Sequence, residues 1–129
     1  MTAPRPTMAK ILLVDDQPDI RFVMGEFLES LGHEVIKASS APSGLEMLES
    51  ERPDLVFLDL TMPDMSGTEA LAQIRRQEAT RHTRVLLLTG STSTEELDQA
   101  RELGIEGIIP KPWQSADVAS QIVAAMARS

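Results

Sequence analysis

The 129-residue sequence contains no cysteine and no tyrosine, and its only aromatic residues are three phenylalanines and one tryptophan. The absence of cysteine excludes a disulfide framework, a thiolate zinc site and a cysteine nucleophile. No apolar run approaches the length of a membrane span, and the first residues hold Pro4 and Pro6 without an apolar core. We therefore expect neither a transmembrane helix nor a signal peptide, and we expect a cytoplasmic protein.

Basic residues are also scarce. The sequence has 20 acidic and 12 basic residues, which gives a net charge of -8. This balance argues against direct binding to nucleic acid, because phosphate backbones require clustered positive charge. An acidic chain of this length instead suits one domain that binds a cation or the basic face of a protein partner.

Short apolar runs alternate with amphipathic segments along the chain, which predicts β-strands alternating with α-helices. The expected strands are residues 11–14, 34–38, 55–58, 85–88 and 107–110. The expected helices are residues 18–31, a segment opened by Ser40, a segment capped by Ser66, and residues 93–103 and 115–127. Glutamates three residues after Ser66 and Ser93 complete two capping-box patterns.

Strands that alternate with helices form parallel sheets, because a parallel strand needs a long crossover connection. We predict an α/β fold with a five-stranded parallel sheet in the order 2-1-3-4-5 and helices on both faces. The second strand is the most polar, and Pro110 removes a backbone donor from the fifth, so both suit the edges of the sheet.

Acidic side chains follow two strands that this order places side by side. Asp15 and Asp16 end the first strand, and Asp59 ends the buried third strand. Thr89 and Lys111 follow the fourth and fifth strands at the same edge, where α/β sheets bind their ligands. Three close carboxylates repel one another unless a cation compensates, and Mg²⁺ prefers oxygen ligands. We therefore expect a magnesium site made by the three aspartates and a backbone carbonyl just past Asp59.

Such a site suits phosphoryl transfer, because Mg²⁺ neutralises phosphoryl charge and a carboxylate can act as the nucleophile. Lys111 and the Thr89 hydroxyl are expected to contact further phosphoryl oxygens. Simpler interpretations stay open for single residues. They are Asp59 as the start of a loop, Asp16 as the cap of the following helix, Thr89 as a turn residue and Lys111 as a solvated side chain.

The motifs at these positions resemble the receiver domains of two-component response regulators over residues 9–127. They are Val14-Asp15-Asp16, Asp59 within Asp-Leu-Thr-Met-Pro-Asp-Met-Ser-Gly, Thr89-Gly90 and Lys111-Pro112. The domain itself is expected to occupy residues 10–129, after a flexible tail at residues 1–9.

The resemblance implies a role for each of these residues. Asp59 is the expected phosphoacceptor and takes its phosphoryl group from a sensor histidine kinase or a histidine phosphotransfer protein. Asp16 and Asp59 are expected to bind Mg²⁺ directly, Asp15 through water, and Thr61 through its carbonyl. Thr89 is the expected switch hydroxyl, Lys111 the phosphate-binding lysine, and the Lys111-Pro112 bond is expected to be cis.

One position departs from the family pattern. Receivers usually carry an aromatic residue three positions before the lysine, and this sequence has Ile108 there. We expect either a purely structural role for Ile108 or a different route of signal to the face formed by the fourth helix, fifth strand and fifth helix. Trp113 is as readily a packing residue as a signalling one.

The expected function is a phosphorylation-controlled switch that changes binding to a downstream protein, as a monomer or a phosphorylation-dependent dimer, and not an enzyme with turnover on a separate substrate. Two alternatives stay open: a Mg²⁺-dependent phosphohydrolase with Asp59 as nucleophile, and a pseudo-receiver that binds partners without phosphorylation. A flavin-binding protein of similar topology is disfavoured by the carboxylates after the first strand. Because little sequence follows residue 127, we expect a stand-alone regulator, with a fragment of a longer protein as the alternative.

Overall fold

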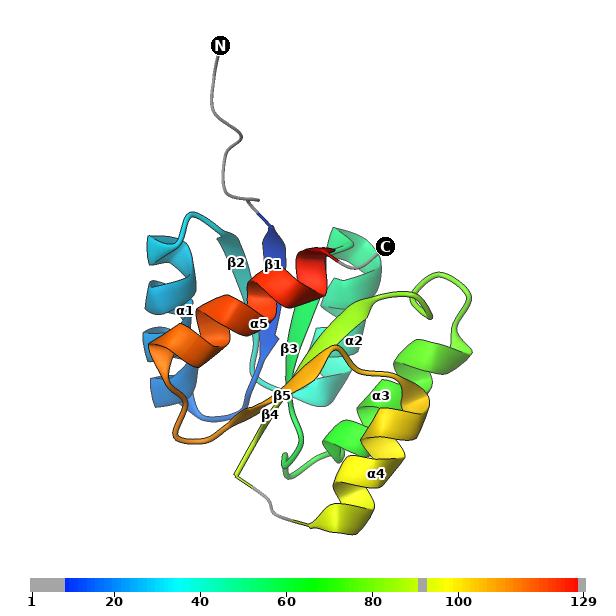
Figure 1. Ribbon diagram of the computed structural model, residues 1–129. Helices are drawn as coiled ribbons and strands as arrows, with labels where there is room; N and C mark the ends of the chain where they lie inside the picture. The colour runs from blue at the N-terminus through cyan, green and yellow to red at the C-terminus, as the bar shows by residue number, and fades with distance from the viewer. Residues whose placement is uncertain (1–8, 91–92, 128–129) are drawn as a thin grey trace.

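The computed structural model describes residues 9–90 and 93–127, in which five strands alternate with five helices (Figure 1). The strands are β1 (Lys10–Val14), β2 (Glu34–Ala38), β3 (Leu55–Asp59), β4 (Arg84–Thr89) and β5 (Gly107–Pro110). The helices are α1 (Pro18–Ser30), α2 (Ala41–Glu51), α3 (Gly67–Arg76), α4 (Thr94–Leu103) and α5 (Ser115–Ala127). Within these described ranges, no helix is long and apolar enough to cross a membrane.

All five strands are parallel, and their order is β2-β1-β3-β4-β5, which confirms the predicted sheet. The polar β2 and the proline-terminated β5 form the two edges, as expected. Asp59 pairs with Leu88, and Thr89 pairs with Pro110. The carboxyl ends of β1, β3, β4 and β5 therefore meet at one edge of the sheet.

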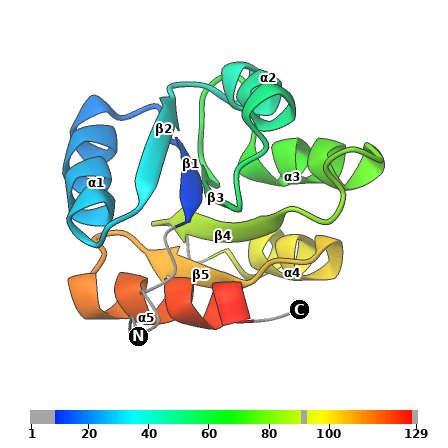
Figure 2. The ribbon, with the colours of Figure 1, turned by 90° about the horizontal axis from the view of Figure 1, so that it is seen from above.

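Helices α1 and α5 cover one face of the sheet, and α2, α3 and α4 cover the other (Figure 2). Alternate residues of β3 serve the two cores: Leu55 and Phe57 face α1 and α5, whereas Val56 and Leu58 face the other three helices. A slip of β3 by one residue would exchange these faces. Burial on both sides therefore fixes the register that places Asp59 at the edge.

Serine side chains cap α2, α3 and α4. The hydroxyl of Ser66 accepts from the backbone N–H of Glu69 at 3.2 Å, and that of Ser93 accepts from Glu96 at 3.5 Å, as the capping-box patterns predict. The N-cap of α1 is Gln17, which makes no side-chain capping bond. Asp16 is thus not the cap of α1, and that simpler interpretation of this residue is wrong.

Arg75, at the end of α3, ties three segments together through hydrogen bonds to backbone carbonyls. Its Nε donates to Leu103 at 2.9 Å and its Nη2 to Gly104 at 2.7 Å, both at the C-terminal end of α4. Its Nη1 donates to Arg81 and Thr83, each at 2.8 Å, in the loop before β4. A guanidinium offers five N–H donors in a rigid plane, which suits this role.

The strands extend slightly beyond the apolar runs that predicted them. Asp59 and Thr89 are the last residues of β3 and β4, because backbone pairing continues past the last apolar side chain. Ala9, assigned to the tail by sequence, is buried, and its N–H donates to Nδ1 of His33 at 3.0 Å. Residues 1–8 of the expected tail lie outside the described residues.

Candidate functional site

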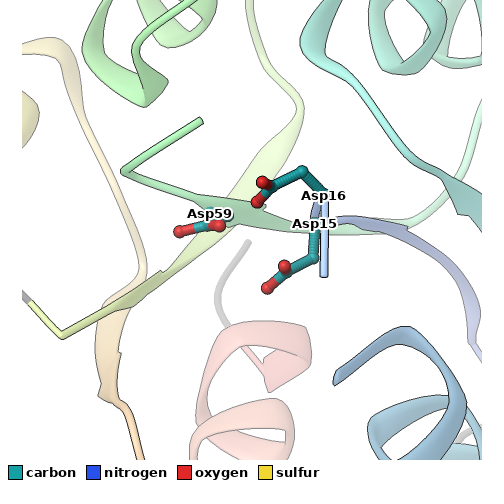
Figure 3. Close-up of side chains that lie close together, drawn as sticks. All are labelled: Asp15, Asp16 and Asp59. Carbon is teal, nitrogen blue, oxygen red and sulfur yellow. The ribbon is translucent and has the colours of Figure 1, made fainter. Parts of the chain in front are cut away.

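Three carboxylates converge where β1 and β3 end side by side (Figure 3). Asp15 and Asp16 come directly after β1, and Asp59 ends β3. One carboxylate oxygen from each residue lies within 4.8 Å of those of the other two. The structure thus brings together the three aspartates that the strand order predicted to meet.

Burial makes this cluster electrostatically unusual. Asp15 is fully buried and Asp59 is only 2% exposed, whereas Asp16 is partly exposed. Burial raises the pKa of Asp59 from 3.8 to about 6. The Thr61 N–H, which donates to Asp59 Oδ1 at 3.1 Å, opposes this rise, and the neighbouring charge of Asp15 adds to it. Asp59 is therefore ionised at neutral pH but more basic than an ordinary carboxylate.

Lys111 supplies the positive charge at the site. Its Nζ lies 2.8 Å from Asp15 Oδ2 and 3.2 Å from Asp59 Oδ2, and it donates to Gln17 Oε1 at 3.2 Å. Burial alone lowers the pKa of Lys111, but its contacts with Asp15 and Asp59 outweigh burial and raise that pKa above its usual value. The Lys111-Pro112 peptide bond is cis, as the family resemblance predicted.

Thr61 and Thr89 complete the edge of the site. Thr61 is exposed in the loop after β3, and Thr89 is buried at the end of β4. The carbonyl of Thr89 accepts from the Lys111 N–H at 2.9 Å, which couples β4 to the lysine. An open cleft faces the solvent here, lined by Asp16, Gln17, Asp59, Thr61, Met62, Pro63, Gly90 and Lys111.

The donor set of the cluster fits a hard divalent cation. Every candidate ligand atom on the three aspartates is a carboxylate oxygen, and the exposed Thr61 beside the cleft carries a backbone carbonyl. Mg²⁺ is typically held by one or two carboxylates together with water and substrate phosphate. The partly exposed Asp16 leaves one side of the cluster open to such waters.

Gly67 holds the loop that joins Asp59 to α3. Its N–H donates to the Leu60 carbonyl at 2.7 Å. A Cβ at this position would lie 2.5 Å from Leu60 Cα and 2.6 Å from the carbonyl oxygen of Asp59. Only glycine lets the start of α3 approach the backbone around the candidate nucleophile this closely.

Two contacts of the site were not predicted. Gln17 reaches Lys111, and Nη1 of Arg21 donates to the Asp15 carbonyl at 2.8 Å. The position of Gln17 directly after the two aspartates places it near the cleft, but nothing in the local sequence indicates its partner. Gln17 and Lys111 are 94 residues apart in the sequence, and they meet because the sheet brings the carboxyl ends of β1 and β5 to the same edge.

The structure also places Ile108, which lies in β5, and Trp113, which lies between β5 and α5. Ile108 is partly buried and packs against the core under α2, α3 and α4. Trp113 packs against α1, with its ring centroid 5.3 Å from that of Phe27 and the planes tilted by 36°. The contact agrees with the packing interpretation of Trp113.

Comparisons with known proteins agree on one family. The family model of the response regulator receiver domain matches residues 11–123. Protein PilH of Pseudomonas aeruginosa is 31% identical over 122 residues, which cover 93% of this chain and 99% of PilH. The solved structure of chemotaxis protein CheY4 of Vibrio cholerae matches with a TM-score of 0.86 and 30% identity, covering 92% of this chain and 99% of that one.

A further relative is longer than this chain. The alkaline phosphatase synthesis transcriptional regulatory protein PhoP of Bacillus subtilis is 35% identical over 122 residues, which cover 93% of this chain but 49% of PhoP. The chain thus spans about half the length of that relative and nearly all of PilH. The family match, the sheet order and the aspartate cluster agree, and the chain belongs to the response regulator receiver domain family.

Proposed function

We propose that the protein is a phosphorylation-controlled switch of a two-component phosphorelay, with Asp59 as phosphoacceptor. The observation that carries the proposal is the setting of Asp59, a buried carboxylate with a raised pKa that faces both the aspartate cluster and Lys111. A more basic carboxylate is a better nucleophile, and its pKa of about 6 still leaves it ionised at pH 7.

The proposed chemistry is transfer of a phosphoryl group from a histidine of a sensor kinase or histidine phosphotransfer protein. A carboxylate oxygen of Asp59 attacks phosphorus, an O–P bond forms as the N–P bond breaks, and the leaving imidazole recovers the electron pair. Lys111 donates to a phosphoryl oxygen, and the Thr89 hydroxyl, at the end of β4, donates to another. The charge-assisted contact of Lys111 orients the phosphoryl group so that the attacking carboxylate oxygen and the leaving imidazole nitrogen lie in line across phosphorus.

Mg²⁺ is the proposed cofactor, and when bound it neutralises charge on the transferring group. Asp16, Asp59 and the Thr61 carbonyl would hold it directly, and Asp15 would act through a water molecule. Asp16 suits a direct ligand because it is partly exposed at the cleft, whereas Asp15 is fully buried and already paired with Lys111.

The proposed output is a change in binding to a downstream protein through α4, β5 and α5. Phosphorylation adds negative charge at Asp59 and draws Thr89 and Lys111 toward it, which alters the connection between β4 and α4. The protein is proposed to lack turnover on a separate substrate, and to act as a monomer or a phosphorylation-dependent dimer. Direct nucleic acid binding is not part of the proposal, since the net charge is -8.

Intact-mass spectrometry after incubation with Mg²⁺ and acetyl phosphate tests the proposal. The wild type should gain one phosphoryl group, and Asp59→Asn should gain none. Asp64→Asn is the matched control, because Asp64 is an exposed aspartate in the same loop. Equal labelling of wild type and Asp59→Asn would refute the assignment of the phosphoacceptor, and sustained turnover of a phosphate ester would favour the phosphohydrolase alternative.

A further inference from the structure

The ammonium group of Lys111 is surrounded by three oxygen atoms from three residues. Asp15 Oδ2 lies at 2.8 Å, and Asp59 Oδ2 and Gln17 Oε1 each lie at 3.2 Å. A lysine ammonium has three N–H donors and no acceptor. Gln17 Oε1 accepts one of these donors, and the two carboxylate oxygens form ion pairs with the ammonium group, so the three oxygens together hold it in place.

The oxygen of Gln17 differs from the other two in charge and in exposure. Asp15 and Asp59 are buried carboxylates, whereas Gln17 is a neutral, exposed residue directly before α1. Its backbone is nevertheless held in place, because its N–H donates to Asp15 Oδ1 at 2.9 Å. One oxygen of the Asp15 carboxylate thus accepts from the Gln17 backbone, and the other forms an ion pair with Lys111.

When Asp59 is phosphorylated, one of the three contacts of Lys111 must change and the other two can remain. The negative charge at Asp59 then moves onto the phosphoryl oxygens, which lie on the side of the ammonium group that contacts Asp59 Oδ2 at 3.2 Å. The contacts with Asp15 and Gln17 require no change. They hold the ammonium group while its contact with the Asp59 carboxylate is exchanged for a contact with a phosphoryl oxygen.

We propose that Gln17 is a positioning residue for the phosphoryl transfer, and that it acts by orienting the ammonium group of Lys111. The proposal rests on the proposed function of Asp59 and Lys111, and it adds a residue that contacts Asp15 through its backbone N–H and Lys111 through its side chain. A neutral acceptor is suited to this task, since a third carboxylate would add negative charge beside the incoming phosphoryl group.

A double-mutant cycle separates positioning from a purely structural effect. The variant Gln17→Met has a side chain of similar length that lacks the amide oxygen. In the wild-type background it should slow phosphorylation by acetyl phosphate about threefold, which corresponds to the lower end of the net contribution of one hydrogen bond. In the Lys111→Met background the same change should have no effect. An equal slowing in both backgrounds, or none in either, would overturn the proposal.

NMR of the lysine side chains in the unphosphorylated protein tests the contact without any reaction. The Lys111 ammonium protons, identified by their loss in Lys111→Met, should exchange with water about threefold faster in Gln17→Met. Gln17→Glu keeps an oxygen at this position and should restore slow exchange. Unchanged exchange in Gln17→Met would overturn the proposal. A wild type that takes no phosphoryl group but shows this exchange pattern would refute the proposed function and leave the contact established.

Discussion

Replacing Asp59 by asparagine should stabilise the metal-free protein at neutral pH. Asp59 is 2% exposed and close to Asp15, and its folded-state pKa of about 6 exceeds the value of 3.8 for an unperturbed group. The folded state therefore binds more protons than the unfolded state between these two pH values. Stability must fall as pH rises through this window, because ionising Asp59 costs more in the folded protein.

The size of the effect follows from the two pKa values. A rise of about 2 pKa units, at about 1.4 kcal/mol per unit, makes the ionised carboxylate cost on the order of 3 kcal/mol at pH 7.5. At pH 4.5 much of the group is protonated in the folded state, and the cost falls to about 1 kcal/mol. Asparagine keeps an oxygen that can accept from the Thr61 N–H, but it carries no charge.

Urea unfolding in EDTA at pH 4.5 and 7.5 measures this difference. We expect the gain in unfolding free energy of Asp59→Asn over wild type to be about 2 kcal/mol larger at pH 7.5 than at pH 4.5. Asp64→Asn, at an exposed position of the same loop, should show no such dependence. A gain that is the same at both pH values, or a less stable Asp59→Asn at pH 7.5, would refute the electrostatic reasoning.

Three further changes test other parts of the site. Mg²⁺ should raise the melting temperature of the wild type, because it binds the folded state. In calorimetric titration, Asp15→Ala should weaken Mg²⁺ binding roughly 10-fold, and Asp16→Ala should weaken it more. Equal losses of affinity in the two variants would contradict the ligand assignment. Gly67→Ala should lower the unfolding free energy by about 1–3 kcal/mol and slow phosphorylation, because its Cβ meets backbone. Gly90→Ala, with 3.9 Å to its nearest neighbour, is the control for the unfolding free energy, and a Gly67→Ala variant as stable as the wild type would disprove the clash. Ile108→Tyr should enlarge the amide shifts that beryllofluoride causes in α4, β5 and α5, since an aromatic ring buries more area than the isoleucine side chain. Equal shifts in both proteins would exclude a signalling route through position 108.

The carboxylate cluster was predictable because strand order alone determines it. Asp59 follows an uninterrupted apolar run, and Asp15 and Asp16 follow another. Once β1 and β3 are neighbours, the ends of both runs must meet at one edge, whatever the details of side-chain packing. Backbone topology thus carries the prediction, and side-chain conformation hardly enters it.

Contacts that depend on side-chain conformation were not predictable in the same way. The apolar stripe of α2 consists of Leu45, Met47 and Leu48, of which Leu48 is buried and the other two are partly buried. Gly44, which is not part of that stripe, is buried so closely against β1 that an added Cβ would lie 2.9 Å from Val14. Hydropathy gives no weight to glycine, so this close approach of α2 to the sheet has no signal in the apolar periodicity. The bond from Gln17 to Lys111 likewise joins residues that no local pattern relates.

The bonds of Arg75 restrain the C-terminal end of α4. The guanidinium group holds the carbonyls of Leu103 and Gly104 at the C-terminal end of the helix, while the N-terminal end follows the segment that begins after Thr89. A displacement of α4 that keeps these bonds is a rotation about its C-terminal end. In such a rotation the first turn of α4, which follows the carboxyl end of β4 and the proposed phosphoacceptor site, would move furthest.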